Sequence, residues 1–235
     1  MQFTALLFTL LASGAALAAP STRATKTRCD VSSVTIPLPS SQPSGTPLAT
    51  PIAGGPKFIG IGVGVQNYTC GTTGTYTNVG ALAEIFDISC FSPDDFDVVT
   101  DLANEVWQAA PKDITAAEVI DDLAEVHPAF VLGQHFFIPN PAGSGLSPKW
   151  DFTSASEAGN PNAFVVGAKT GDIPDPTDPS VNIDWLSLKP VEGELADQIY
   201  RIQTRNGQPP SSCTPGSPEI FVRYVAQYWF YGGEF

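Results

Sequence analysis

The stretch FIGIGVGVQNY, from Phe58 to Tyr68, alternates branched apolar residues with glycines. A strand repeats every two residues, so the branched side chains share one face of a predicted strand. The other face carries the three glycines Gly60, Gly62 and Gly64. Glycine within a strand commonly marks a close approach by another group. We therefore expect an aromatic ring or a helix to pack against this smooth strip, and the alternative is a ligand groove.

Alternating apolar patterns predict further strands along the chain, separated by turn-rich segments such as the predicted loop 139–148. These strands are Val79–Ile88, Phe130–Ile138, Ala163–Ala168, Ile183–Leu188, Gln198–Thr204 and Ile220–Tyr231. Between the strands Val79–Ile88 and Phe130–Ile138, within 93–126, apolar residues recur at helical spacing and predict two short helices. The second helix begins with a capping box formed by Thr115 and Glu118. The sequence thus predicts a mainly β fold, an antiparallel β-sandwich or barrel with a short two-helix insertion.

The N-terminus predicts export. Residues 1–18 have a short apolar core and end in Ala16-Leu17-Ala18, the pattern of a cleavable signal peptide. Residues 19–56 are rich in proline and serine, so we expect an extended arm, followed by one β-rich domain over 57–235. We therefore predict a secreted, extracellular protein.

Four cysteines fit this compartment, because an even number in an exported chain usually forms disulfides. Three pairings of Cys29, Cys70, Cys90 and Cys213 are open. In a long hairpin Cys70 and Cys90 would lie at opposite ends, which disfavours joining them. Among the remaining choices we favour Cys29–Cys90 with Cys70–Cys213. The sequon that begins at Asn67 predicts N-glycosylation.

The formal net charge of −13 argues against nucleic acid and anionic membranes as partners. The cysteines are too far apart for a zinc site, and Asp172, Asp175 and Asp178 lack the spacing of a calcium-binding EF-hand. We expect a monomer that holds no metal and no cofactor.

Several motifs recur together in one known family. They include Gly64-Val65-Gln66-Asn67-Tyr68-Thr69-Cys70, Gly133-Gln134-His135-Phe136-Phe137 and Tyr228-Trp229-Phe230-Tyr231. The chain resembles a family of uncharacterised secreted proteins of filamentous fungi over most of its length. The resemblance implies a compact β-rich domain and assigns no catalytic residues.

Many members of that family carry the label "malate dehydrogenase", which the residues do not support. A dinucleotide site needs G-x-G-x-x-G between a strand and a helix. Here the motif fails at its sixth position, which is Val65 or Asn67, and a second strand follows. We predict that the chain is not an NAD-dependent dehydrogenase.

Candidate chemistry centres on His135, which lies in a predicted strand. Arg201 and Arg223 also lie in strands, where we expect each to meet an acidic residue. A cluster of these residues with a carboxylate such as Asp151 is the best candidate site. Acidic residues in or beside strands that could form a glycosidase pair are Glu84, Asp87, Asp151 and Asp184.

No complete catalytic motif is present, so we favour a non-catalytic domain that binds a cell-wall glycan or an extracellular protein. The first alternative is an extracellular hydrolase with its site near His135. The second is an effector or protease inhibitor that acts on a host protein.

Overall fold

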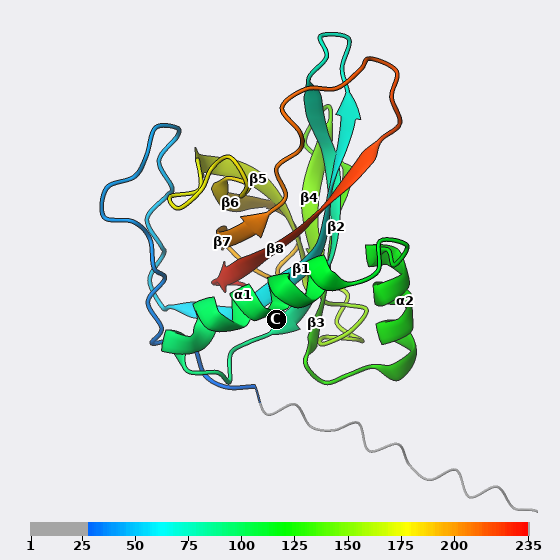
Figure 1. Ribbon diagram of the computed structural model, residues 1–235. Helices are drawn as coiled ribbons and strands as arrows, with labels where there is room; N and C mark the ends of the chain where they lie inside the picture. The colour runs from blue at the N-terminus through cyan, green and yellow to red at the C-terminus, as the bar shows by residue number, and fades with distance from the viewer. Residues whose placement is uncertain (1–27, 235) are drawn as a thin grey trace, which may run out of the picture.

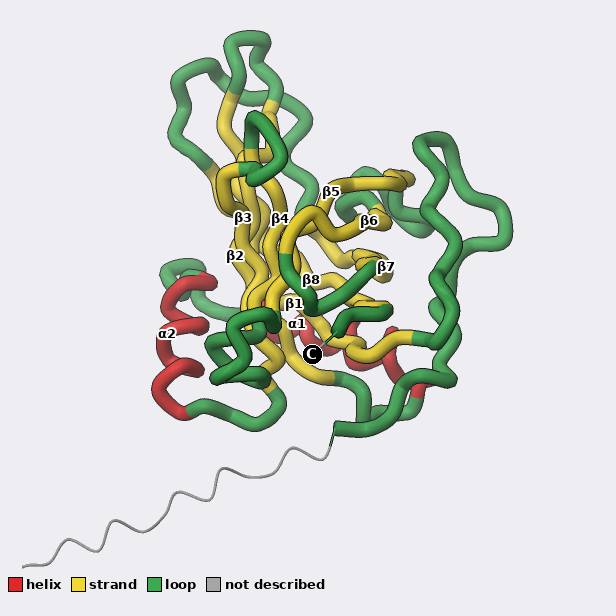
Figure 2. The backbone as a smooth tube through the Cα atoms, turned by 180° about the vertical axis from the view of Figure 1, so that it is seen from behind, coloured by secondary structure: helices red, strands yellow, loops and turns green. Residues whose placement is uncertain are grey.

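Eight antiparallel strands form a closed barrel in the computed structural model of this protein, which describes residues 28–234 (Figures 1 and 2). Each strand pairs with the next along the chain, and β1 closes the barrel against β8. The predicted mainly β fold is confirmed, and of the two predicted architectures it is the barrel. The predicted signal peptide, residues 1–18, lies outside the described residues.

The elements follow the predicted order. The strands are β1 (Pro56–Cys70), β2 (Tyr76–Asp87), β3 (Val131–Pro139), β4 (Leu146–Asp151), β5 (Phe164–Ile173), β6 (Trp185–Glu192), β7 (Gln198–Asn206) and β8 (Ile220–Tyr231). Between β2 and β3 lie a short 3-10 turn, α1 (Phe96–Ala109) and α2 (Ala116–Val126), which confirms the two-helix insertion. Thr115 and Glu118 form the predicted capping box of α2. Among residues 28–234, no helix is long and apolar enough to cross a membrane.

Two sequence predictions about loops were wrong. The first half of strand β4 falls within the predicted loop 139–148, and the whole strand was missed because Pro148 lacks a backbone donor and interrupts the strand pattern. β4 pairs with β5 over only three residues, Lys149 to Asp151, so its pattern is also short. The loop before the predicted strand Val79–Ile88 is shorter than that prediction implies, since β2 already begins at Tyr76.

The side chains form two apolar layers, one inside the barrel and one outside. The inner layer includes Phe58, Ile85, Leu132 and Phe230, all buried. The outer layer joins the branched side chains of β1 to α1, which lies across the barrel (Figure 1). Trp107 of α1 anchors this contact, because its indole Nε1 donates a hydrogen bond to the carbonyl oxygen of Gly64 at 2.7 Å.

The glycines of β1 face the barrel interior, where neighbouring side chains occupy the space that a Cβ atom would need. A Cβ on Gly62 would lie 2.5 Å from the ring of Tyr228, and one on Gly60 would lie 2.7 Å from Ile85. The predicted packing of an aromatic ring against the glycine strip is therefore confirmed.

The disulfides are Cys29–Cys90, with Cα atoms 5.1 Å apart, and Cys70–Cys213, with Cα atoms 5.9 Å apart. This is the pairing that the sequence favoured. The first fastens the N-terminal arm to the segment before α1. The second joins the end of β1 to the loop before β8, and these two segments lie together at the top of Figure 1.

Gly62→Ala tests the glycine strip. We expect the free energy of unfolding in urea to fall by about 1–3 kcal/mol, because the new methyl group overpacks a filled interior. Gly143→Ala is the matched control, since the nearest atom to its Cβ would be 3.7 Å away, on Asn140. The control should change stability by less than about 0.5 kcal/mol. Equal effects of the two substitutions would refute the packing role.

Candidate functional site

The two ends of the barrel interior differ. At one end the rings of Phe58, Phe152 and Phe230 pack edge to face, with centroids 5.3 Å apart for the closer pairs. At the other end, a cavity of about 580 Å³ opens among the β1–β2, β3–β4, β5–β6 and β7–β8 turns. The cavity falls within the size range of small-ligand sites.

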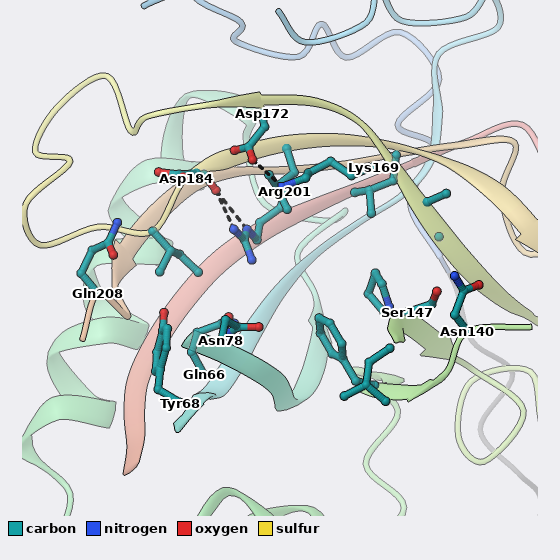
Figure 3. Close-up of a pocket in the computed structure, with 18 residues that line it drawn as sticks. Gln66, Tyr68, Asn78, Asn140, Ser147, Lys169, Asp172, Asp184, Arg201 and Gln208 are labelled. Atoms are coloured by element: carbon teal, nitrogen blue, oxygen red, sulfur yellow. Dashed lines mark hydrogen bonds and ion pairs between the residues drawn. The ribbon is translucent and has the colours of Figure 1, made fainter. Parts of the chain in front are cut away.

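Polar side chains from several strands line this cavity together with the rings of Tyr68 and Phe137 (Figure 3). The polar groups that matter most below are Gln66, Asn78, Lys169, Asp172, Asp184 and Arg201. Lys169 and Asp172 form an ion pair at 2.5 Å near the rim and so neutralise each other. The lining therefore offers both donors and acceptors beside an aromatic surface.

Arg201 projects from β7 into the cavity. Its Nε and Nη2 atoms donate hydrogen bonds to the carbonyl oxygen of Asp184 at 3.1 and 2.8 Å (Figure 3). The guanidinium thus binds an acidic residue through its backbone oxygen rather than through its carboxylate. Burial, followed by the nearby charge of Asp172, raises the pKa of the Asp184 carboxyl, so its charged form is disfavoured.

A hydrogen-bonded path links Arg201 to the opposite wall. Burial raises the pKa of the Tyr228 hydroxyl, and the charge of Arg201 and hydrogen bonds from Arg201 and Tyr224 offset part of that rise. The hydroxyls of Tyr224 and Tyr228 are 2.9 Å apart. Beyond them, the side-chain oxygen of Gln66 accepts a hydrogen bond from Asn78 at 3.1 Å. Gln66 Nε2 is buried near the Tyr224 hydroxyl, whose pKa is raised by burial and in part lowered by Gln66, but makes no well-formed hydrogen bond among the described residues.

His135 lies inside the barrel but does not line the cavity. Its side chain is 2% exposed, stacks on Trp150 at a centroid distance of 4.6 Å, and donates from Nδ1 to the carbonyl oxygen of Lys149 at 3.0 Å. Burial lowers its pKa to about 3, and the charge of Arg201 contributes to the decrease. The imidazole is therefore neutral and sealed from solvent.

The other two candidate residues lie outside the barrel. Asp151 forms an ion pair with Lys149 at 2.8 Å on the outer face of β4. Arg223 stacks on Trp107 and donates hydrogen bonds to four carbonyl oxygens at the end of α1 and in the loop that follows. The prediction that Arg223 meets an acidic residue was wrong, because these carbonyl groups satisfy its donors. The structure thus brings Arg201 near His135 and leaves Asp151 and Arg223 apart from them.

The predicted carboxylate candidates do not gather at the cavity either. Asp184 is the only one of the four that lines it. Glu84 is buried on the outer face of β2, against which α2 packs, and Asp87 accepts a hydrogen bond from the backbone of Ser89. Among residues 28–234, no group of three or more histidine, cysteine or acidic side chains could hold a metal ion.

Asp175 and Asn67 belong to two sequence features noted above, the acidic loop 172–178 and the glycosylation sequon. Asp175 accepts hydrogen bonds from Trp185 and Thr204 through one carboxylate oxygen and from its own loop through the other. Its oxygens therefore serve the loop that leads to β6. Asn67 lies half-buried within β1, and its glycosylation stays a prediction.

Sequence reasoning overlooked Gln66, although a signal was present. Gln66 continues the inward face of Gly60, Gly62 and Gly64 and is the first polar side chain on that face. A polar residue at an inward position beside an apolar run indicates either a buried hydrogen bond or a cavity. Tyr224 of β8 lies beside Gln66, and its hydroxyl is a further polar group at this position.

Comparison with known proteins places the chain in a family without naming a function. A family described as "Protein of unknown function (DUF3455)" matches residues 51–232. The chain belongs to this family. The matched region of the DUF3455 domain covers all eight strands and both helices. No curated protein and no solved structure matches the chain.

His135 gives the DUF3455 barrel a dependence on acidity. Its folded pKa of about 3 lies below the ordinary value of 6.5, so the unfolded chain binds a proton that the folded chain does not. Stability should therefore fall as the pH decreases from 6.5 towards 3, by up to about 1.4 kcal/mol per pH unit. Urea unfolding of wild type and His135→Gln between pH 7 and 4 measures this, and an unchanged pH slope in the variant would contradict it.

Glu84 gives the opposite dependence. Burial raises its pKa from 4.5 to about 8, so the folded chain holds a proton that the unfolded chain releases. This contribution to stability is complete below pH 4.5 and is lost as the pH rises to 8. Glu84→Gln should therefore become more stable relative to wild type between pH 5 and 8. A constant difference between the two proteins across that range would show that Glu84 is ionised in the folded state.

Proposed function

We propose that this protein is a secreted, non-catalytic binding protein that holds a saccharide unit of a cell-wall glycan in the open end of its barrel. The observation that carries the proposal is the cavity of about 580 Å³, lined by amides, charged groups and two aromatic rings. A closed barrel of eight strands can enclose one small ligand at its mouth.

The chemistry of the lining favours a sugar. A saccharide presents several hydroxyls that both donate and accept hydrogen bonds, and amide and carboxyl side chains such as Asn78, Gln66 and Asp184 match them. The rings of Tyr68 and Phe137 offer apolar surface to the C–H groups of a sugar ring. A protein partner would instead need a broad surface of several hundred Å² on each side.

The position of His135 gives no support to the hydrolase alternative. A general base must lie within hydrogen-bond reach of its substrate, and His135 is buried below the cavity. The effector and protease-inhibitor alternatives would use an exposed surface, such as that of Val98, Leu102 and Val106 on α1, and do not account for the cavity. The label "malate dehydrogenase" also lacks support, because an antiparallel barrel has no strand-to-helix turn of the dinucleotide-binding kind.

Secretion is part of the proposal and draws support from the two disulfides, which persist in oxidising compartments. Cleavage after Ala18 and glycosylation of Asn67 are likewise proposed, and intact mass of the exported protein measures both.

Binding to glycans tests the proposal. Calorimetric titration with short oligosaccharides of β-1,3-glucan, chitin, xylan and pectin should give saturable binding to at least one of them. Phe137→Ala should weaken that binding about ten-fold, because it removes the aromatic surface in the cavity.

Phe221→Ala is the matched control. Phe221 is a phenylalanine that is 61% exposed and does not line the cavity, so its removal should leave the affinity unchanged. Absence of binding to every oligosaccharide, or an equal loss in both variants, would overturn the proposed function.

A further inference from the structure

Arg201 is a cation inside the barrel without an ion-pair partner. None of the ion pairs within 4.0 Å among residues 28–234 includes it. Its hydrogen bonds go to uncharged oxygens, those of the Asp184 backbone and the Tyr228 hydroxyl. A partly buried charge without a counter-ion is costly to the folded protein, so an unpaired guanidinium in a cavity indicates a place for an anion.

Two donor groups in the cavity, on Arg201 and Gln66, are not fully satisfied by the protein. Gln66 Nε2 is a second, independent sign of unmet donor capacity, because Gln66 lines the cavity, is only 3% exposed and makes no well-formed hydrogen bond among the described residues, although the Tyr224 hydroxyl lies near it. The Tyr228 hydroxyl faces Arg201 and already shares a hydrogen bond with the Tyr224 hydroxyl at 2.9 Å. A guanidinium carries five N–H donors and no acceptor, so a ligand that accepts hydrogen bonds would complete the cluster.

The remaining charges of the cavity do not supply that acceptor. Asp172 is paired with Lys169, and Asp184 turns its carbonyl oxygen, not its carboxylate, to the guanidinium. Arg201 therefore faces the cavity with no carboxylate hydrogen-bonded to it, although the whole chain carries a net charge of −13.

We propose that the sugar bound in the cavity is an acidic one, a hexuronate whose carboxylate accepts hydrogen bonds from Arg201 and Gln66. This inference rests on the proposed function and narrows its ligand class. A carboxylate fits the guanidinium because two parallel N–H···O bonds give both charge and geometry. The ring of the sugar then lies towards the mouth, near Tyr68 and Phe137.

Paired sugars test the inference. Glucuronate, galacturonate and mannuronate are titrated beside glucose, galactose and mannose, so that each acid has a neutral counterpart of the same ring geometry. We expect at least one hexuronate to bind at least about ten-fold more tightly than its neutral hexose. Arg201→Gln should weaken that binding by about 10- to 100-fold, and Arg201→Lys should restore part of it.

Two further variants keep the test interpretable. Arg205→Gln removes the same charge from the same strand, but Arg205 pairs with Asp101 outside the cavity, so hexuronate affinity should not change. Gln66→Leu replaces the amide by an apolar side chain of similar size and should also weaken hexuronate binding. This variant tests the inference even if Arg201→Gln fails to fold. Near-ultraviolet circular dichroism reports folding of each variant.

The outcomes separate this inference from the proposed function. Equal affinity for hexuronates and neutral hexoses, or hexuronate binding unchanged in folded Arg201→Gln and Gln66→Leu, overturns the inference alone. If the protein binds neutral oligosaccharides but none of the hexuronates, the inference of an acidic ligand is overturned and the proposed function stands. Absence of binding to every saccharide overturns both.

Discussion

The barrel depends on the absence of side chains along the inner face of β1. Gly60, Gly62 and Gly64 let β2 and β8 fill the interior from either side, with Ile85 and Tyr228 in the space that Cβ atoms would take. Because β1 pairs with both of these strands, it joins the two ends of the sheet. Protein interiors are packed as densely as organic crystals. The packing of Ile85 and Tyr228 against the glycines therefore determines which part of the barrel interior is filled by side chains.

The cavity begins where that packing ends. Beyond the glycines, β1 places Gln66 inward, and β8 places the hydroxyl of Tyr224 beside it. The aromatic rings fill the opposite end, so polar groups gather only near the open mouth. Arg201 lies in this polar part of the barrel interior and contacts backbone and hydroxyl oxygens. The same architecture that closes the barrel therefore leaves a cation facing an open space.

The sequence predicted the order of the elements well, because alternation and helical spacing are local signals. It missed β4, whose pattern is short and interrupted by Pro148. The candidate site was only partly predictable. A period of two tells which residues share a face, but only closure of the barrel tells which face is inside. β8 is apolar on both faces, so Arg223 could not be assigned to the outer face, where it meets carbonyl groups of the α1–α2 segment.

The central claim is that Arg201, which has no ion-pair partner among the described residues, and Gln66 together recognise the ligand in the cavity. Nuclear magnetic resonance of the ¹⁵N-labelled protein follows both side-chain N–H groups directly during titration with a hexuronate. The account predicts that the Arg201 Nε and Gln66 Nε2 signals shift together and saturate, while the Arg205 and Arg223 signals stay in place. Unchanged Arg201 and Gln66 signals in the presence of bound sugar would contradict it.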